Sequence, residues 1–190
     1  MSEKVFPGVL LFLVIILQIG CSSKKNATHT SEEACDTIRI EASYSQRLTK
    51  ELPTFISDTF TNKAVETFTI ESLQKKHSKM LPLKKEPFRN IHDSSKIDTI
   101  YHFSGKKDTI KFYCTHEKNF MIYLHLVSPE LSLNPCIRPG ISKTRFKSFF
   151  GISRPVGDTI QIANSDGTLR FIFYFTGDLL KQIESDFYFG

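Results

Sequence analysis

Residues 168–175 decide the fold of this chain, and they read Thr168-Leu169-Arg170-Phe171-Ile172-Phe173-Tyr174-Phe175. Phenylalanine at every second position is typical of a β-strand, because successive side chains point to opposite faces of a sheet. We expect the phenylalanine side, together with Leu169, to face the core. The other side carries Arg170, Ile172 and Tyr174, and it is less polar than a surface covered only by water. Either a helix or a binding partner must cover it, so these three residues form the candidate binding face.

Further strands are predicted on both sides of this stretch. Each shows the same alternation, and short turns rich in Gly, Asp, Ser or Lys separate most of them. The predicted strands are residues 98–103, 108–113, 120–127, 158–163 and 179–189. Short turns between consecutive strands indicate antiparallel neighbours.

A helix is predicted from Ser142 to Phe150. Ser142 can accept a hydrogen bond from a free backbone N–H at the first turn. Phe146, Phe149 and Phe150 follow the spacing of one apolar helix face. Gly151 stands where a helix commonly ends in a left-handed residue.

A second helix is predicted from Thr69 to Met80, because good helix formers fill this segment and Pro82 stops it. The Thr- and Phe-rich residues 55–68 are expected to be irregular or extended. Pro82 and Pro87 are expected to bracket a short basic connection.

The two halves share an order, with a helix followed by three strands in residues 69–127 and again in 137–190. Asp-Thr-Ile at residues 98–100 recurs at 158–160. Repetition at a fixed spacing indicates a duplicated structural unit. We therefore predict an α+β fold, in which two tandem helix-plus-three-strand antiparallel units form one domain over residues 36–190.

A family resemblance follows from the segment that opens the second half. It reads Ile137-Arg138-Pro139-Gly140-Ile141-Ser142-Lys143, then Phe149-Phe150-Gly151, then Pro155. This order resembles the repeat of small lipoproteins of the outer-membrane barrel-assembly machinery, which the β-lactamase-inhibitor-like fold carries twice. Three residues, rather than one, separate Gly151 from Pro155, and the first half lacks the Gly-Ser opening. The resemblance implies this fold and a role in binding proteins, and it names no partner.

The N-terminal segment indicates where the protein resides. Residues 9–17 are continuously apolar, and Gly20 and Cys21 follow shortly after them. Nine helical residues at about 1.5 Å each cannot cross a hydrocarbon core of about 30 Å. The segment resembles a bacterial lipoprotein signal peptide, although Gln18 stands where an apolar residue is usual. An ordinary cleaved signal, or a short uncleaved anchor with Cys21 incidental, is the alternative.

The resemblance implies a signal peptide at 1–20 and a membrane anchor through lipid on Cys21. The polar residues 21–35 then form a lipidated N-terminus and flexible tether. Lys24 and Lys25 follow the lipidated residue, where surface-exported lipoproteins of some bacteria carry acidic residues. We expect attachment to the outer or cytoplasmic membrane with the domain facing the periplasm, and the cell surface stays open.

Three cysteines remain beyond Cys21, an odd number for an oxidising compartment. Cys114 shares strand parity with Ile110 and Phe112, so it is expected on the buried face. We favour a disulfide between Cys35 and Cys136, and three reduced cysteines are the alternative.

The charge of the chain is uneven. Its formal net charge is +5, and residues 71–107 hold nine Lys or Arg against four Asp or Glu. Such a run is typical of a solvated face, and it can also bind an anionic surface or an acidic partner. Nucleic acid is not an expected partner of an exported, anchored protein.

No residue set specifies a reaction. His92 and Asp93 are neighbours on the chain, and such pairs rarely point at each other. The Cys-Thr-His triplet at residues 114–116 offers two metal ligands without a second pair. Asp166 and Asp178 fall in predicted turns, where Asp is common. We predict no catalytic residue, no metal and no cofactor.

The sequence thus favours a lipid-anchored envelope lipoprotein that acts as a non-enzymatic protein-binding or adaptor module. One alternative is a periplasmic inhibitor or immunity protein. The other is an enzyme with a site assembled from scattered residues. Its oligomeric state is left open.

Overall fold

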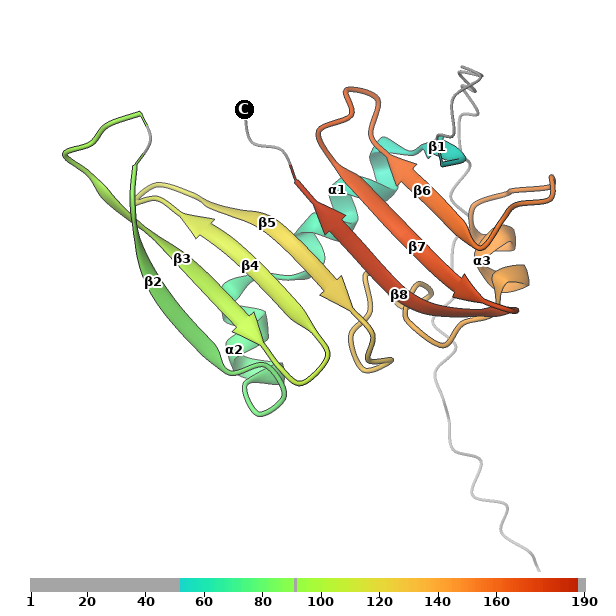
Figure 1. The fold of residues 1–190 in the computed structure, drawn as a ribbon, viewed down its shortest axis with the longest axis horizontal. Coiled ribbons are helices and arrows are strands. Elements are labelled where there is room, and N and C mark those ends of the chain that lie inside the picture. Colours follow the sequence, from blue (N-terminus) through green and yellow to red (C-terminus); the bar gives the residue numbers. More distant parts are fainter. Residues whose placement is uncertain (1–51, 91, 188–190) are drawn as a thin grey trace, which may run out of the picture. The chain divides into compact units, whose positions relative to one another are not determined.

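The computed structural model describes residues 52–90 and 92–187, and its strands form one sheet (Figure 1). The strands are β1 (Thr54–Ile56), β2 (Leu83–Arg89), β3 (Ile97–Ser104), β4 (Thr109–Cys114), β5 (Asn119–Leu126), β6 (Thr159–Ala163), β7 (Arg170–Thr176) and β8 (Leu179–Asp186). The helices are α1 (Asp58–Thr67), α2 (Ile70–His77) and α3 (Lys143–Phe149). The predicted signal peptide, the predicted lipidation site Cys21, the predicted tether and Cys35 lie outside the described residues.

The eight strands follow the order β1-β6-β7-β8-β5-β4-β3-β2. β1 pairs in parallel with β6, and every other pair is antiparallel. The two meanders β2–β5 and β6–β8 are joined where residues 123–126 of β5 pair with residues 183–186 of β8. One continuous mixed sheet results.

The prediction of two tandem helix-plus-three-strand units is wrong. The fold is dominated by the eight-stranded sheet, with three short helices, and β1 crosses to the far edge to pair with β6. The two Asp-Thr-Ile triplets are not equivalent either. Ile160 is fully buried opposite Phe173, whereas Ile100 is half-buried opposite Tyr113 on the other face of the sheet.

Two local predictions in the first half are also wrong. Residues 58–67, expected to be irregular, form α1, because Ser57 caps the helix and Phe60 and Ala64 recur on one buried side. The connection between Pro82 and Pro87 is the edge strand β2, and an edge is where a sheet tolerates proline. The helix at Thr69–Met80 is confirmed as α2, with Thr69 as its N-cap.

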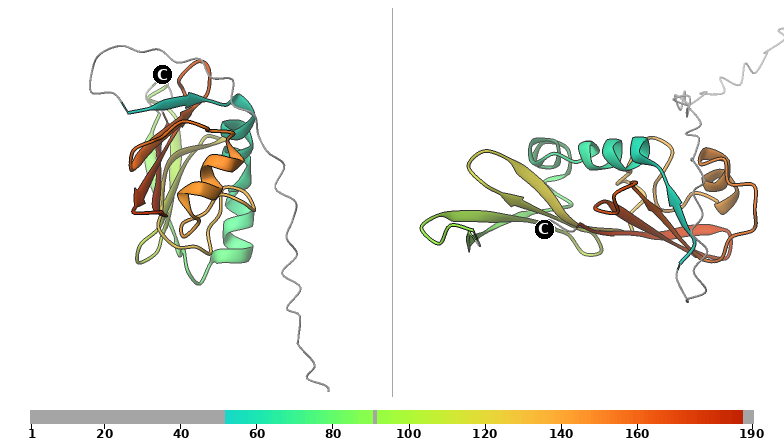
Figure 2. Two further views of the ribbon diagram at one scale, coloured as in Figure 1. Left: turned by 90° about the vertical axis from the view of Figure 1, so that its right-hand side faces the viewer. Right: turned by 90° about the horizontal axis from the view of Figure 1, so that it is seen from above.

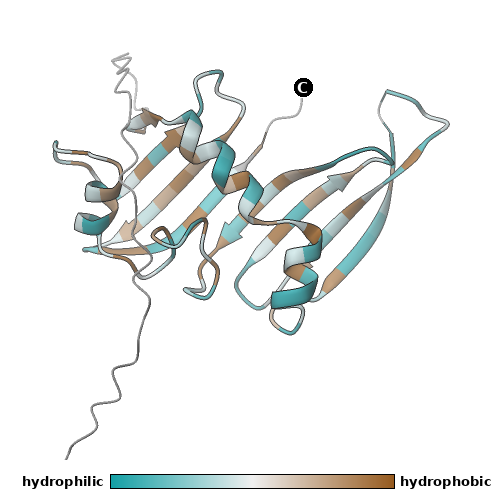
Figure 3. Ribbon diagram, turned by 180° about the vertical axis from the view of Figure 1, so that it is seen from behind, coloured by the Kyte–Doolittle hydropathy of each residue, from teal (hydrophilic) through white to brown (hydrophobic). Residues whose placement is uncertain are grey.

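All three helices lie on one face of the sheet, as the views from above and from behind show (Figures 2 and 3). Phe60 of α1 contacts Phe150 of α3 at 4.9 Å and Phe171 of β7 at 5.7 Å between ring centroids. Phe146 packs on Phe173 at 4.8 Å, so the predicted apolar stripe of α3 is confirmed. Of the helices in the described ranges, none is both long and apolar enough to cross a membrane.

Candidate functional site

The candidate binding face lies on β7, whose two sides differ as the alternation predicted. Phe171 and Phe173 are fully buried beneath the helices, whereas Arg170 is exposed and Ile172 and Tyr174 are half-buried. No helix in the described part of the chain covers this second side, which we call the open face (Figure 1). By strand register, its side chains include Lys84, His102, Lys111, Tyr123, His125, Thr159, Gln161, Arg170, Ile172, Tyr174, Gln182 and Glu184.

A polar network centred on Glu184 occupies the middle of the open face. Strand register places Glu184 opposite Ile172 on β7 and opposite His125 on β5. One carboxylate oxygen accepts a hydrogen bond from Gln182 at 2.7 Å and lies 3.1 Å from His125 Nδ1. The other oxygen accepts from the Tyr174 hydroxyl at 2.9 Å. Three strands thus hold the polar groups of this face in fixed positions.

The environment of Tyr174 keeps its hydroxyl protonated. Burial raises the pKa of Tyr174, and the hydrogen bond to Glu184 raises it further. The phenol therefore remains a hydrogen-bond donor at neutral pH.

Next to this network, Lys111 Nζ lies 5.4 Å from the Tyr123 ring centroid, which is within the distance of a cation–π interaction.

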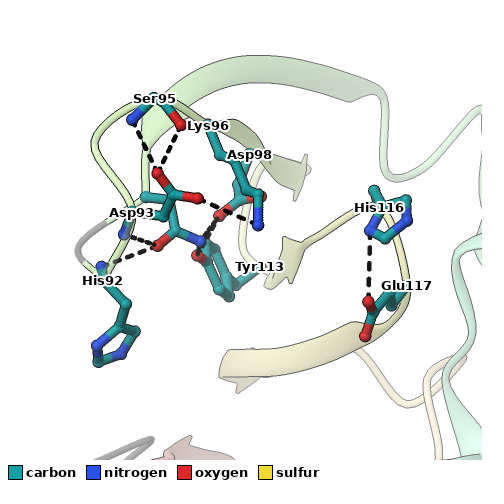
Figure 4. A network of polar contacts seen from close by, with 9 residues as sticks. His92, Asp93, Ser95, Lys96, Asp98, Tyr113, His116 and Glu117 are labelled. Carbon is teal, nitrogen blue, oxygen red and sulfur yellow. Dashed lines mark hydrogen bonds and ion pairs between the residues drawn. The ribbon is translucent and has the colours of Figure 1, made fainter.

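A second cluster lies where β2 and β4 end and β3 begins (Figure 4). Asp98 is buried and accepts hydrogen bonds from Asn90 Nδ2 at 2.6 Å and from the Tyr113 hydroxyl. The hydrogen bond from Tyr113 to Asp98 raises the pKa of Tyr113, and burial raises it further. Phe88 packs edge-on against the Tyr113 ring at 5.9 Å. The hydrogen bonds of Asn90 thus connect the loop between β2 and β3 to Asp98 of β3 and Tyr113 of β4.

The same loop contains His92 and Asp93. Their backbone N–H groups both donate to Asn90 Oδ1, at 2.8 and 2.9 Å. The Asp93 carboxylate accepts from Ser95, which lowers the pKa of Asp93, while the His92 ring points away from it (Figure 4). The prediction of a loop pair whose side chains do not point at each other is confirmed.

The triplet at residues 114–116 does not form a site in the described structure. The Cys114 side chain is buried on the helix-covered face, as predicted, and burial raises the pKa of its thiol to about 11. The His116 side chain is 88% exposed in the following turn. The described residues contain no group of three or more His, Cys, Asp or Glu that could hold a metal ion.

A hollow of about 640 Å³ adjoins the β1 edge of the open face. It is lined by Leu52, Thr54, Ile56, Gln161, Ala163, Asn164, Ser165, Asp166, Gly167 and Arg170. Its polar groups are largely engaged within the loop: Asp166 accepts from Thr168, and Arg170 Nε donates to Gly167 O at 2.9 Å. The bonds from Thr168 lower the pKa of Asp166. Hydrogen bonds within the turn thus hold the polar side chains that line the hollow. Asp166 lies in a turn, as expected.

The two described cysteines differ in state. Cys114 is a free thiol, and Cys136 is disulfide-bonded. Since no other cysteine belongs to the described residues, the partner of Cys136 lies outside them. The pairing of Cys136 with Cys35 stays a prediction.

Sequence reasoning found the candidate binding residues of β7 and missed Glu184 and His125 on the same face. Glu184 lies in a predicted strand. Whether its side chain lies on the same face as Tyr174 depends on the pairing register of the two strands. A bulge between Tyr174 and Phe175 shifts that register, so the sequence alone does not reveal it. His125 lies 59 residues from Glu184 in the chain. No local pattern pairs those two strands.

Comparison with protein-family models, with curated proteins and with solved structures found no significant match.

Proposed function

We propose that this protein is a lipid-anchored lipoprotein of the bacterial envelope whose domain binds another envelope protein through the open face. The observation that carries the proposal is the half-buried surface around Ile172, Tyr174 and Glu184, which no helix of the described chain covers. Tyrosine rings combine apolar area with a polar tip, so they are enriched at interfaces. The lipid anchor is inferred from the signal-like segment that ends at Cys21.

The Glu184 network supports binding because its groups are pre-ordered. A partner that contacts fixed side chains loses less conformational entropy at the interface than one that must order flexible side chains. Ile172 provides apolar contact on the same face as Tyr174, and strand register places Glu184 between Ile172 and His125. A central apolar contact with polar groups around it is the usual anatomy of a protein interface.

Capture from detergent-solubilised membranes tests the proposal. The tagged full-length chain is expected to retain one envelope protein at stoichiometric yield. Ile172→Arg should reduce that yield at least tenfold, while the arginine can pair with Glu184 opposite it and so leave the fold intact. Ile97→Arg is the matched control, because Ile97 is 63% exposed at the start of β3, away from this site.

Equal capture by wild type and Ile172→Arg would contradict the proposed site. The identity of the captured protein separates the forms of the proposal: a stable envelope assembly indicates an adaptor, whereas a hydrolase or toxin indicates an inhibitor or immunity protein.

A further inference from the structure

Three basic side chains stand directly opposite one another across neighbouring strands of the open face. Lys84 on β2 pairs with His102 on β3, and His102 pairs with Lys111 on β4. Residues paired across a sheet project from the same face, so the three form one row, which we call the basic row. Tyr123 on β5 continues the row toward the Glu184 network.

Among the described residues, the acidic group within ion-pair distance of the basic row is Glu86, which contacts His102. Neither Lys84 nor Lys111 makes an ion pair with any residue in the described ranges. His102 Nε2 lies 3.3 Å from Glu86 Oε2 but makes no hydrogen bond with it. This buried nitrogen has no hydrogen-bond partner among the described residues.

The other cations of the basic stretch at residues 71–107 lie elsewhere. Lys75 and Lys76 are on α2, which covers the opposite face. Lys85 points to that same side, 4.7 Å from the Tyr101 ring, and Lys96 pairs with Asp93 at 3.1 Å. The stretch is therefore not one patch, and the basic row draws Lys111 from outside it.

We infer that the basic row binds an acidic segment of the partner protein. The inference rests on the proposed function, whose interface it extends from β7 across to β2. Carboxylates of the partner would neutralise Lys84 and Lys111 and offer His102 Nε2 an acceptor. Tyr123 would then contact the apolar side chains that flank those carboxylates.

A protein segment fits the row better than a lipid surface. Recognition of anionic membranes usually takes a cluster of four to eight Lys or Arg. The row has two lysines and one histidine, and half-buried Tyr123 and Ile100 lie beside it on the same face. Few charges set among aromatic and apolar groups are typical of protein interfaces.

Fluorescence anisotropy with a defined probe tests the inference. The probe is a labelled twelve-residue peptide of alternating Glu and Tyr, and a Gln-Tyr peptide is its uncharged control. The full-length chain in non-ionic detergent is expected to bind the acidic peptide at least tenfold more tightly than the control. The double variant Lys84→Glu/Lys111→Glu should lose this preference. Lys75→Glu/Lys76→Glu changes the net charge equally on the helix side and should stay within twofold of wild type.

Three results would overturn the inference: equal losses in the two double variants, equal binding of both peptides, or binding to phosphatidylglycerol vesicles without binding to the peptide. Capture from membranes distinguishes a failure of the basic-row inference from a failure of the proposed function. If Ile172→Arg abolishes capture and Lys84→Glu/Lys111→Glu does not, the open face binds a partner without the basic row. If neither variant affects capture, the open face itself is excluded.

Discussion

Glu184 on β8 contacts side chains from both neighbouring strands, Tyr174 on β7 and His125 on β5. It therefore links the two meanders through side chains at the place where their backbones are also paired. Charge-assisted hydrogen bonds of this kind are stronger than neutral ones. A single carboxylate thus holds side chains from three strands of the open face in place.

The ionisation of Tyr174 reports on this environment. Because the protonated phenol is favoured in the folded state, its raised pKa stabilises the fold below about pH 10, the ordinary tyrosine value. That contribution is lost as the pH rises through the raised pKa. Glu184→Gln should lower the pKa of Tyr174 only in part, because burial is the larger cause.

Absorbance titration at 295 nm measures this shift. The chain has six tyrosines, so the curve of Tyr174→Phe is subtracted from that of wild type. A difference curve centred at or below pH 10 would mean that Tyr174 is not buried in solution. An identical curve in Glu184→Gln would mean that the Glu184 carboxylate does not raise the pKa of Tyr174.

At the scale of elements, α3 is the clearest case of a helix formed by packing. It has seven residues, fewer than an isolated helix needs in water. Ser142 caps its first turn by accepting from the Arg145 N–H at 3.1 Å, and Gly151 follows its end with φ of 63°. The Phe146 ring, between those ends, lies 4.7 Å from Phe150 and 5.3 Å from Phe175.

Phe146→Ala should therefore lower the free energy of unfolding by about 3–5 kcal/mol, as expected for a fully buried phenylalanine. Urea denaturation followed by circular dichroism measures the loss. Thr144→Ala, at an exposed position of the same helix, should change the free energy of unfolding by less than about 0.5 kcal/mol. Equal midpoints for Phe146→Ala and wild type would mean that α3 does not pack on β7.

The elements predicted well were those with a strong local period, such as α3 and β7. β2 was missed because its two lysines and a proline do not alternate, and an edge strand needs no apolar face. α1 was missed because threonines mask its pattern. The spacing from Ser57 through Phe60 to Ala64 is the signal that could have found it.

At the scale of the molecule, one hydrophobic core spans both meanders. Asp108 secures the chain where it leaves β5, accepting hydrogen bonds from the backbone N–H groups of Val127 at 2.7 Å and Ser128 at 2.9 Å. The segment that follows contains the disulfide-bonded Cys136 and leads to α3. The disulfide of Cys136 therefore lies in the chain connection between the two meanders.

The proposed lipid determines which cysteine makes that link. A cysteine sulfur carries either a thioether or a disulfide, so acylation of Cys21 leaves Cys35 as the partner of Cys136. Non-reducing peptide mapping of protein purified from membranes should find Cys35 joined to Cys136, Cys21 acylated and Cys114 free.

Cys21→Ala is the control for that mapping, and it should keep the disulfide while losing palmitate label and membrane attachment. A Cys21–Cys136 bond, or unlabelled Cys21 in wild type, would contradict the lipoprotein proposal.

The sequence by itself determined the strands of the second half, α3, the buried side of β7 and the position of Cys114. These features depend on local periodicity, which is visible along a single segment. Only the tertiary structure decided the strand order, the pairing of β1 with β6 and of β5 with β8, and hence the Glu184 network and the basic row. Every strand carries the same period of two, so periodicity cannot identify its neighbour. That choice depends on how the whole core packs, across chain separations of up to about 100 residues that carry a loop-closure cost with no local signature.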